Sequence, residues 1–214
     1  MIDLRDVTFG YAPGKPVLTG VNFRLGAGEK VGLIGPNGSG KSTLFHLIVG
    51  LLFPSEGTID IFGKVRRREA DFREVRERIG LLFQDADDQL FCPTVAEDVA
   101  FGPLNLGRSH EEAAGIVRDT LEMLNLQGFE DRVTYHLSGG EKRLVSMATI
   151  LAMAPDVLLL DEPASGLHEE PTERLISVLA DHVPSYVIIS HDRRFLERTT
   201  EKIYRLADGT IQSV

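Results

Sequence analysis

The chain has 214 residues and a formal net charge of −9, because 32 acidic residues outnumber 23 basic ones. This acidic balance argues against broad nucleic-acid binding, which a basic excess usually accompanies. Hydrophobic residues make up 43% of the chain, no apolar run approaches the ~18 residues of a membrane span, and a lone cysteine, Cys92, excludes an internal disulfide. We therefore expect one cytosolic α/β domain, without a signal peptide at its first residues and without a nucleic-acid partner.

The first 84 residues predict short strands around one apolar helix. The segment 41–52 is apolar and has the length of a helix, with Gly50 and Pro54 as its stop signals. A basic run at 64–78, KVRRREADFREVRER, interleaves acids with arginines at a spacing that favours a solvated helix with paired charges over a nucleic-acid patch. The segments expected as strands are residues 2–9, 21–26, 30–35, 57–63 and 79–84.

Helices and strands alternate through the rest of the chain. A capping box, Ser109 with Glu112 three positions later, predicts the start of an amphipathic helix, and Ser138 with Glu141 repeats the arrangement before another helix. This alternation predicts a largely parallel sheet, with antiparallel strands near the two ends of the chain. The remaining elements are expected as a buried strand, a helix, a strand, a short helix and a hairpin, at residues 157–161, 172–182, 186–190, after Asp192, and at 202–214.

The stretch GPNGSGKST at 35–43 follows a predicted strand and opens a predicted helix, which is the context that a G-x-x-x-x-G-K-[ST] phosphate loop needs. Glycines let the backbone wrap closely enough for its N–H groups to point at phosphate oxygens, and the helix start adds its dipole. Lys41 can reach the β- and γ-phosphates, and the Ser42 hydroxyl suits Mg²⁺. The residues predicted to bind a nucleoside triphosphate are Gly35, Pro36, Asn37, Gly38, Ser39, Gly40, Lys41, Ser42 and Thr43.

Two carboxylates, Asp161 and Glu162, end a buried strand, and the carboxyl ends of parallel strands border the ligand crevice of a sheet. Asp161 would hold Mg²⁺ through its water shell, and Glu162 would polarise the attacking water. His191 follows the strand at 186–190 and can hydrogen-bond a γ-phosphate, although a lone histidine there is often only a polar loop residue. Gln84 is likewise an ordinary amide at a strand end unless the fold places it at the metal.

A second glycine motif, LSGGE at 137–141, has no nucleophile–base pair and no metal-ligand spacing. With Ser138 as N-cap it presents a hydroxyl, glycine N–H groups and a helix N-terminus, which together form an anion site without a lysine. One chain cannot easily use two anion sites on one triphosphate. Two chains arranged head to tail can, because each then closes the other's site.

The motifs GPNGSGKST, Gln84, LSGGE, VLLLDEP and His191 stand in the order of the ATP-binding cassette (ABC) family, which the chain resembles over nearly its whole length. The resemblance implies an α/β P-loop NTPase fold of the ABC ATPase type over residues 1–214. It implies a mixed, mostly parallel sheet core, an antiparallel β subdomain and an α-helical subdomain at about 85–150. The roles it implies are catalysis by Glu162, His191 and Lys41, and Mg²⁺ binding by Ser42, Gln84 and Asp161.

The same resemblance implies ATP contacts outside the phosphate loop. Tyr11 would stack on adenine, an aromatic face on a π-system. Ser138 and Gly140 would contact the γ-phosphate held by a partner's loop, with Gly139 and Glu141 in the same motif. The partner would be a second copy, in a homodimer, or a second ABC ATPase, in a heterodimer. LSGGE is then half of a composite ATP site.

Residues 83–107, FQDADDQLFCPTVAEDVAFGPLNLG, look like the ATPases of energy-coupling factor transporters, especially those of the cobalt and nickel type. In such proteins this region receives helices from an integral membrane subunit, and the ATPase is peripheral at the cytoplasmic face of the cell membrane. The resemblance implies an importer of a metal ion such as cobalt or nickel, with a vitamin as the second candidate. Composition alone leaves an acidic surface subdomain as the alternative for this region.

Two features depart from the family pattern. The segment SGLHEE places His168 where an aspartate usually follows SGL, which leaves coupling across the dimer through that position open, with Glu169 adjacent. Many energy-coupling ATPases also continue into a longer C-terminal extension, so we expect a dimer of low stability without ATP.

The rival class is a soluble ABC ATPase of DNA repair or translation. Coiled-coil repair members need a long heptad insertion between the two glycine motifs, zinc-bearing ones need cysteine clusters, and translation members carry two cassettes. None of these features is present in this sequence. A small-molecule kinase would explain the phosphate loop but would leave LSGGE without a use. The pattern therefore favours the transporter subunit.

Overall fold

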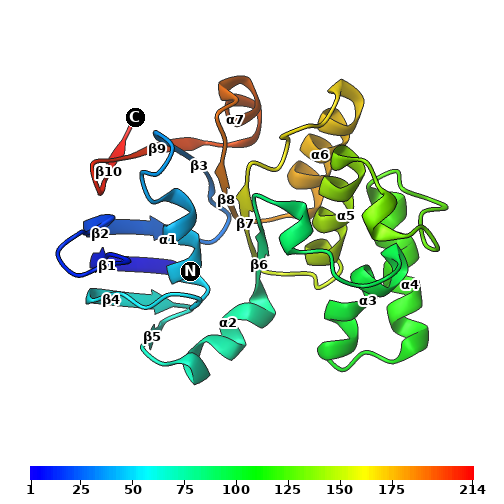
Figure 1. Cartoon of the computed structure of the whole chain (residues 1–214), viewed down its shortest axis with the longest axis horizontal. Coiled ribbons are helices and arrows are strands. Elements are labelled where there is room, and N and C mark those ends of the chain that lie inside the picture. The colour runs from blue at the N-terminus through cyan, green and yellow to red at the C-terminus, as the bar shows by residue number, and fades with distance from the viewer.

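Residues 1–214 are all described by a computed structural model, in which the strands form two sheets and helices pack against them (Figure 1). The smaller sheet is antiparallel, in the order β2-β1-β4-β5, and lies at one end of the molecule. The larger sheet has the order β10-β9-β3-β8-β7-β6. The strands are β1 Ile2–Phe9, β2 Leu18–Leu25, β3 Lys30–Ile34, β4 Glu56–Ile61, β5 Lys64–Arg66, β6 Ile79–Leu82, β7 Val157–Asp161, β8 Tyr186–Ile189, β9 Lys202–Ala207 and β10 Thr210–Ser213.

Alternating apolar residues build the antiparallel sheet. Ile2 and Leu4, and then Val7 and Phe9, are buried along β1. The odd step between Leu4 and Val7 is a β-bulge, at which Asp6 has a φ of 51°. The bulge keeps both pairs of side chains in the core that this sheet shares with the helix after the phosphate loop.

Wholly apolar strands build the larger sheet. All positions of β7 and β8 are buried, as expected for central strands covered on both faces. Neighbouring strands are parallel except for the β9–β10 hairpin, which turns at Asp208 and Gly209 with φ values of 50° and 73°. The expected mixed, mostly parallel core sheet and the separate antiparallel sheet are confirmed. The register aligns the carboxyl ends of β3, β6, β7 and β8, so the loops that carry the predicted site leave one edge.

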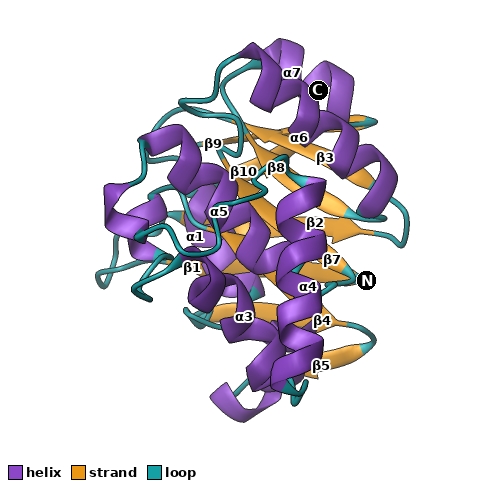
Figure 2. Cartoon of the chain, turned by 90° about the vertical axis from the view of Figure 1, so that its right-hand side faces the viewer, coloured by secondary structure: helices purple, strands orange, loops and turns teal.

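Three helices, α3, α4 and α5, pack together at the end of the molecule opposite the antiparallel sheet (Figures 1 and 2). The capping boxes predicted at Ser109 and Ser138 open α4 and α5. None of the helices combines the length and the hydropathy that a membrane span needs. The bounds expected for the helical subdomain, about 85–150, stay a prediction. The α-helices are α1 Lys41–Ile48, α2 Arg73–Arg78, α3 Val95–Asn105, α4 His110–Met123, α5 Gly139–Leu151, α6 Glu169–His182 and α7 Arg193–Thr199, and the 3₁₀ helices are η1 Glu69–Phe72, η2 Ala86–Asp88 and η3 Thr134–His136.

The helix expected over 41–52 is shorter than predicted, because it ends at Ile48. Gly50 adopts a left-handed φ of 71°, which ends the helix. A Cβ at Gly50 would lie 2.2 Å from a ring atom of Phe72, so a distant aromatic side chain fixes the turn.

The single helix expected over 64–78 is also wrong, since that run forms β5, η1 and α2 in turn. Arg66 is the reason, because its buried guanidinium donates to the carbonyl oxygens of Ile61 at 2.9 Å and Asp71 at 2.7 Å. Asp71 in turn accepts from the backbone N–H groups of Arg67 and Arg68. These contacts fold the run back on itself, which helical periodicity alone does not reveal.

Candidate nucleotide-binding site

The phosphate loop joins β3 to α1, and two of its glycines hold positions that leave no room for a side chain. Gly40 has a φ of 101°, and a Cβ on it would lie 2.8 Å from Leu18 Cδ2. A Cβ on Gly35 would lie 2.1 Å from the carbonyl oxygen of Leu206 in β9. The loop therefore wraps closely against β2 and β9, which is the tight backbone that a phosphate cradle needs.

Lys41 is buried against the loop that precedes it. Its Nζ donates to the carbonyl oxygens of Gly35 and Pro36, both at 2.9 Å. Burial lowers the pKa of Lys41, while two nearby carboxylates act in the opposite direction. Ser39 Oγ is buried in the same loop without a hydrogen-bond partner. A cation and an unpartnered hydroxyl in one glycine cradle fit a phosphate group.

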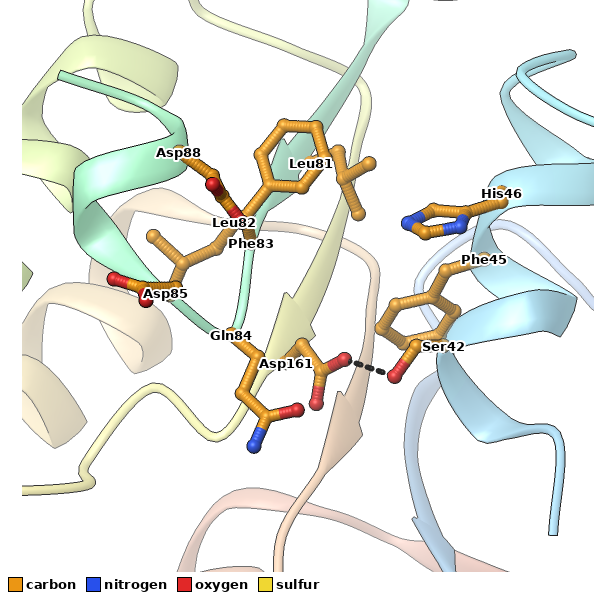
Figure 3. Close-up of a pocket in the computed structure, with 10 residues that line it drawn as sticks. All are labelled: Ser42, Phe45, His46, Leu81, Leu82, Phe83, Gln84, Asp85, Asp88 and Asp161. Carbon is orange, nitrogen blue, oxygen red and sulfur yellow. Dashed lines mark hydrogen bonds between the residues drawn. The ribbon is translucent and has the colours of Figure 1, made fainter. Parts of the chain in front are cut away.

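The residues predicted to hold Mg²⁺ meet at one edge of the sheet. Ser42 Oγ donates to Asp161 Oδ2 at 2.6 Å, and Gln84 lines the same cavity of about 500 Å³ (Figure 3). Burial raises the pKa of Asp161, and the hydrogen bond from Ser42 opposes that shift. No group of three or more histidine, cysteine or acidic side chains is placed to hold a metal ion. A hydroxyl, one carboxylate and one amide fit Mg²⁺, which keeps several waters and phosphate oxygens instead.

Glu162 lies next to Asp161 and has one free carboxylate oxygen. Its Oε2 accepts from Ser190 Oγ at 3.2 Å, while its buried Oε1 has no hydrogen-bond partner and lies 3.5 Å from His191 Nε2. Burial raises the pKa of Glu162, and the nearby imidazole of His191 opposes that shift. Its φ of 52° is a strained backbone angle of the kind that clusters at functional sites. Such a carboxylate is suited to take a proton from water.

Tyr11 lies beside the phosphate loop with most of its ring in solvent. The side chain is 65% exposed, and its hydroxyl lies 3.0 Å from Thr43 Oγ1. The ring meets Phe9 edge to face, with the centroids 5.0 Å apart. An exposed aromatic face at this position can stack on a nucleotide base.

Ser138 opens α5 and borders a second hollow. Its Oγ accepts from the Glu141 backbone N–H at 3.4 Å, and the Glu141 carboxylate accepts from the Ser138 backbone N–H at 2.8 Å. The hollow of about 540 Å³ shares Gln84 and Asp85 with the first cavity, but no phosphate-loop residue lines it. The chain thus does not bring its own LSGGE motif and phosphate loop into one pocket. The glycine-rich segments contribute Ser138, Gly139, Gly140, Gly166 and His168 to its lining.

Two polar side chains outside the predicted site fix the segment that carries Gln84. Arg143, buried in α5, donates to the carbonyl oxygens of Phe83 at 2.6 Å and Gln84 at 2.5 Å. Gln89 Nε2 donates to the carbonyl oxygen of Ser146 at 2.8 Å, and its Oε1 accepts from the Phe83 backbone N–H at 3.2 Å. The only sequence signal for Arg143 is a cation inside the apolar stretch of a helix, and Gln89 gives none.

An apolar groove of about 270 Å³ lies between α2, α3, α5 and the end of α1. Leu51, Phe91 and Phe101 line it and are 50%, 66% and 48% exposed. Phe91 and Phe101 meet edge to face, with the centroids 4.8 Å apart. Asp98 also lines the groove, and its buried Oδ2 has no hydrogen-bond partner. Large apolar side chains gathered on a surface in this way are typical of a site that contacts a protein, a membrane or a ligand.

The sequence matches the ABC transporter family model over residues 18–165. The energy-coupling factor transporter ATP-binding protein EcfA of Methanothermobacter thermautotrophicus is 42% identical over 215 residues, covering 99% of this chain and 69% of that protein. EcfA of Methanocaldococcus jannaschii is 43% identical over 215 residues, covering 99% of this chain and 77% of that protein.

Solved structures match the fold. The structure of cbiO1 from Clostridium perfringens, described as part of the ABC transporter complex cbiONQ, has a TM-score of 0.86 at 31% identity and covers 99% of this chain and 86% of that one. A dimeric ATP-binding cassette in a post-hydrolysis state, bound to ADP and Pi, has a TM-score of 0.90 at 28% identity and covers 100% of this chain and 98% of that one. The expected cassette fold is confirmed.

Proposed function

Because the chain belongs to the ABC transporter family of ATPases, we propose that it is the ATP-binding subunit of an importer of the energy-coupling factor class. It hydrolyses ATP and drives the uptake of a metal ion, cobalt or nickel, through membrane partner subunits, with a vitamin as the second candidate. The two relatives named EcfA and the similarity to cbiO1 support this class.

One observation carries the proposal that two chains share each ATP site. The LSGGE segment lines a hollow from which the phosphate loop is absent. A capped helix start with glycine N–H groups binds anions well, so this hollow is suited to the triphosphate held by another chain. The partner is a second copy or a second ABC ATPase. The dimeric form of a similar cassette bound to ADP and Pi supports this arrangement.

Each residue of the site has a role in the proposed hydrolysis. Lys41 and the loop amides bind the phosphates, and Tyr11 holds the base. Glu162 accepts the proton of the attacking water, and His191 hydrogen-bonds the γ-phosphate. Mg²⁺, when bound by Ser42, Asp161 and Gln84, supplies charge that neutralises the phosphate oxygens.

The apolar groove is the proposed contact for the membrane subunits. The groove is adjacent to the segment that carries Gln84, because Phe83 and Gln89 of that segment line the groove together with Phe91 and Phe101. A helix seated in this groove would therefore press on the segment that reaches the metal site. The proposed contact supports a location at the cytoplasmic face of the membrane, with the protein as a peripheral subunit.

Purification of the tagged chain from gently solubilised membranes of its native host tests the proposal. We expect a membrane subunit to be recovered together with a metal- or vitamin-binding component, which would also identify the solute. The Phe101→Ser variant should no longer co-purify with the membrane subunit, because the substitution removes an aromatic ring from the groove. Leu106→Ser is the matched control, since Leu106 is 39% exposed at the end of the same helix but does not line the groove.

Recovery of soluble proteins or nucleic acid alone would overturn the transporter assignment. The rival function, a soluble ABC ATPase of DNA repair or translation, would then take its place, provided that purified protein still hydrolyses ATP. Equal recovery of the membrane subunit by Phe101→Ser and Leu106→Ser would be consistent with the transporter assignment. It would contradict the proposal that the groove is the contact for the membrane subunit.

A further inference from the structure

We propose that the basic segment 64–78 is a contact surface for anionic lipid headgroups, which the protein touches when its apolar groove faces the membrane. The inference rests on the proposed function, because the groove sets which side of the molecule faces the bilayer. The segment carries seven basic and four acidic residues in a chain whose net charge is −9. Nothing in the ATP site uses it.

The position of the segment is the first support. Arg76 on α2 lines the apolar groove, and its guanidinium donates to the carbonyl oxygen of Val49 at 3.2 Å. Arg73 precedes it by three residues, so it lies one helical turn away on the same side of α2. Its side chain is 87% exposed. The basic surface is thus continuous with the rim of the groove.

The pairing of charges is the second support. The acids of the segment are already engaged. Glu74 pairs with Lys64 and Arg66, Glu69 pairs with Arg76, and Glu77 pairs with Arg73 at 3.7 Å. Asp71 accepts from two backbone N–H groups. Two arginines remain outside these contacts, because the exposed side chains of Arg67 and Arg68 form no ion pair. Unpaired guanidinium groups at a surface suit phosphate oxygens.

Exposed apolar side chains within the segment and packed against it select a bilayer as the partner. Phe53 and Val65 are 42% and 45% exposed, and neither lines the groove. The ring of Phe53 packs edge to face on Phe72, the residue before Arg73, with the centroids 5.8 Å apart. Basic residues interleaved with apolar ones are typical of a surface that enters the headgroup layer. A nucleic-acid contact would leave these apolar side chains without a role.

Sedimentation of the purified full chain with vesicles tests the proposal. One set of vesicles is phosphatidylcholine alone, and the other contains about one third phosphatidylglycerol, which gives the anionic surface that basic side chains recognise. We expect binding to the anionic vesicles only, and weaker binding as salt is raised. Each arginine that reaches the surface should contribute about five-fold to the partition coefficient.

Three variants separate charge from structure. R67Q/R68Q/R73Q should lower partition onto anionic vesicles by at least ten-fold, whereas R67K/R68K/R73K should retain most of it because the charge is kept. R5Q/R24Q/R205Q removes the same charge from exposed sites on β1, β2 and β9, and should change partition less than three-fold.

Equal binding by the wild type and the first glutamine variant, or equal binding to both kinds of vesicle, would overturn the proposal. So would failure of the wild type to bind either kind, or binding of duplex DNA in place of vesicles with the same dependence on Arg67 and Arg68. Failure of the lipid contact can be distinguished from failure of the transporter assignment. R67Q/R68Q/R73Q should still co-purify with the membrane subunit, and Phe101→Ser should still bind anionic vesicles.

Discussion

Replacement of Arg143 tests whether helix α5, which begins within the LSGGE motif, holds the segment that carries Gln84 in place. Arg143→Met keeps the length and the apolar stem of the side chain but removes its donors to the carbonyl oxygens of Phe83 and Gln84. We expect a less stable protein in which this segment is loose and ATP hydrolysis is slower. Arg143→Lys should be intermediate, because a lysine can serve one carbonyl but not both.

The magnitude follows from the two hydrogen bonds and the burial of the guanidinium. A hydrogen bond to a charged group contributes about 1.5–3 kcal/mol, so the pair amounts to about 3–6 kcal/mol. The burial that lowers the pKa of Arg143 opposes this gain, since removal of the cation recovers its desolvation cost. The exposed Gln84 can also rehydrate. We therefore expect a net loss of about 2 kcal/mol, or about 4–8 °C in Tm for a chain of this length.

Thermal unfolding, hydrogen exchange and ATPase rate measure the effect. The Phe83 amide, which donates to Gln89 in the same segment, should exchange faster in Arg143→Met, and the rate of hydrolysis should fall about ten-fold or more. Lys142→Met is the control, because the half-buried Lys142 side chain forms a single ion pair, with the exposed carboxylate of Asp87, and its loss should cost less than about 1 kcal/mol. A Tm for Arg143→Met as high as that of Lys142→Met, with unchanged exchange at Phe83, would refute the reasoning.

Three further outcomes are expected. Glu162→Gln should slow ATP hydrolysis by at least about 100-fold and trap ATP-bound dimers on a sizing column, and a variant that stays monomeric with ATP and Mg²⁺ would contradict the shared site. Lys41→Ala should weaken ATP binding in calorimetry by roughly 10- to 100-fold, so an unchanged affinity would contradict the assignment of the phosphate loop. Burial raises the pKa of Glu162, and its ionised form is the base, so ATPase activity should fall with decreasing pH at a higher pH than an ordinary glutamate, near 4.3, would produce. A pH–rate profile whose acid limb lies no higher than that of an ordinary glutamate would contradict the role of this base.

Local patterns predicted much of the fold. The capping boxes at Ser109 and Ser138 could be predicted from the sequence, because each involves residues only three positions apart and does not depend on the rest of the chain. The apolar strands at 157–161 and 186–190 could be predicted as well, because central parallel strands are buried on both faces and are therefore continuous apolar runs in the sequence. The phosphate loop combines a short-range motif with a position directly after an apolar strand. Its glycines are required by the local backbone, and both features can be read from the sequence.

Long-range contacts set what the sequence did not predict. The end of α1 depends on Phe72 beneath Gly50, and the fold of the basic run depends on Arg66 reaching back to Ile61. Arg143 is 59 residues from Gln84 and touches it only because α5 packs beside η2 and β6. Periodicity cannot register such contacts, because it describes one segment at a time and each of these contacts joins two segments.

The hydrogen bonds of Lys41 to its own loop bear on how tightly a nucleotide is held. A phosphate oxygen that takes up this ammonium must break contacts with the carbonyl oxygens of Gly35 and Pro36 that are already good. Association there is an exchange, so its net gain is smaller than the strength of a lysine–phosphate contact suggests. We therefore expect this lysine to add less to the affinity for a nucleotide than an ammonium without such contacts would, and ADP to leave more easily for the same reason.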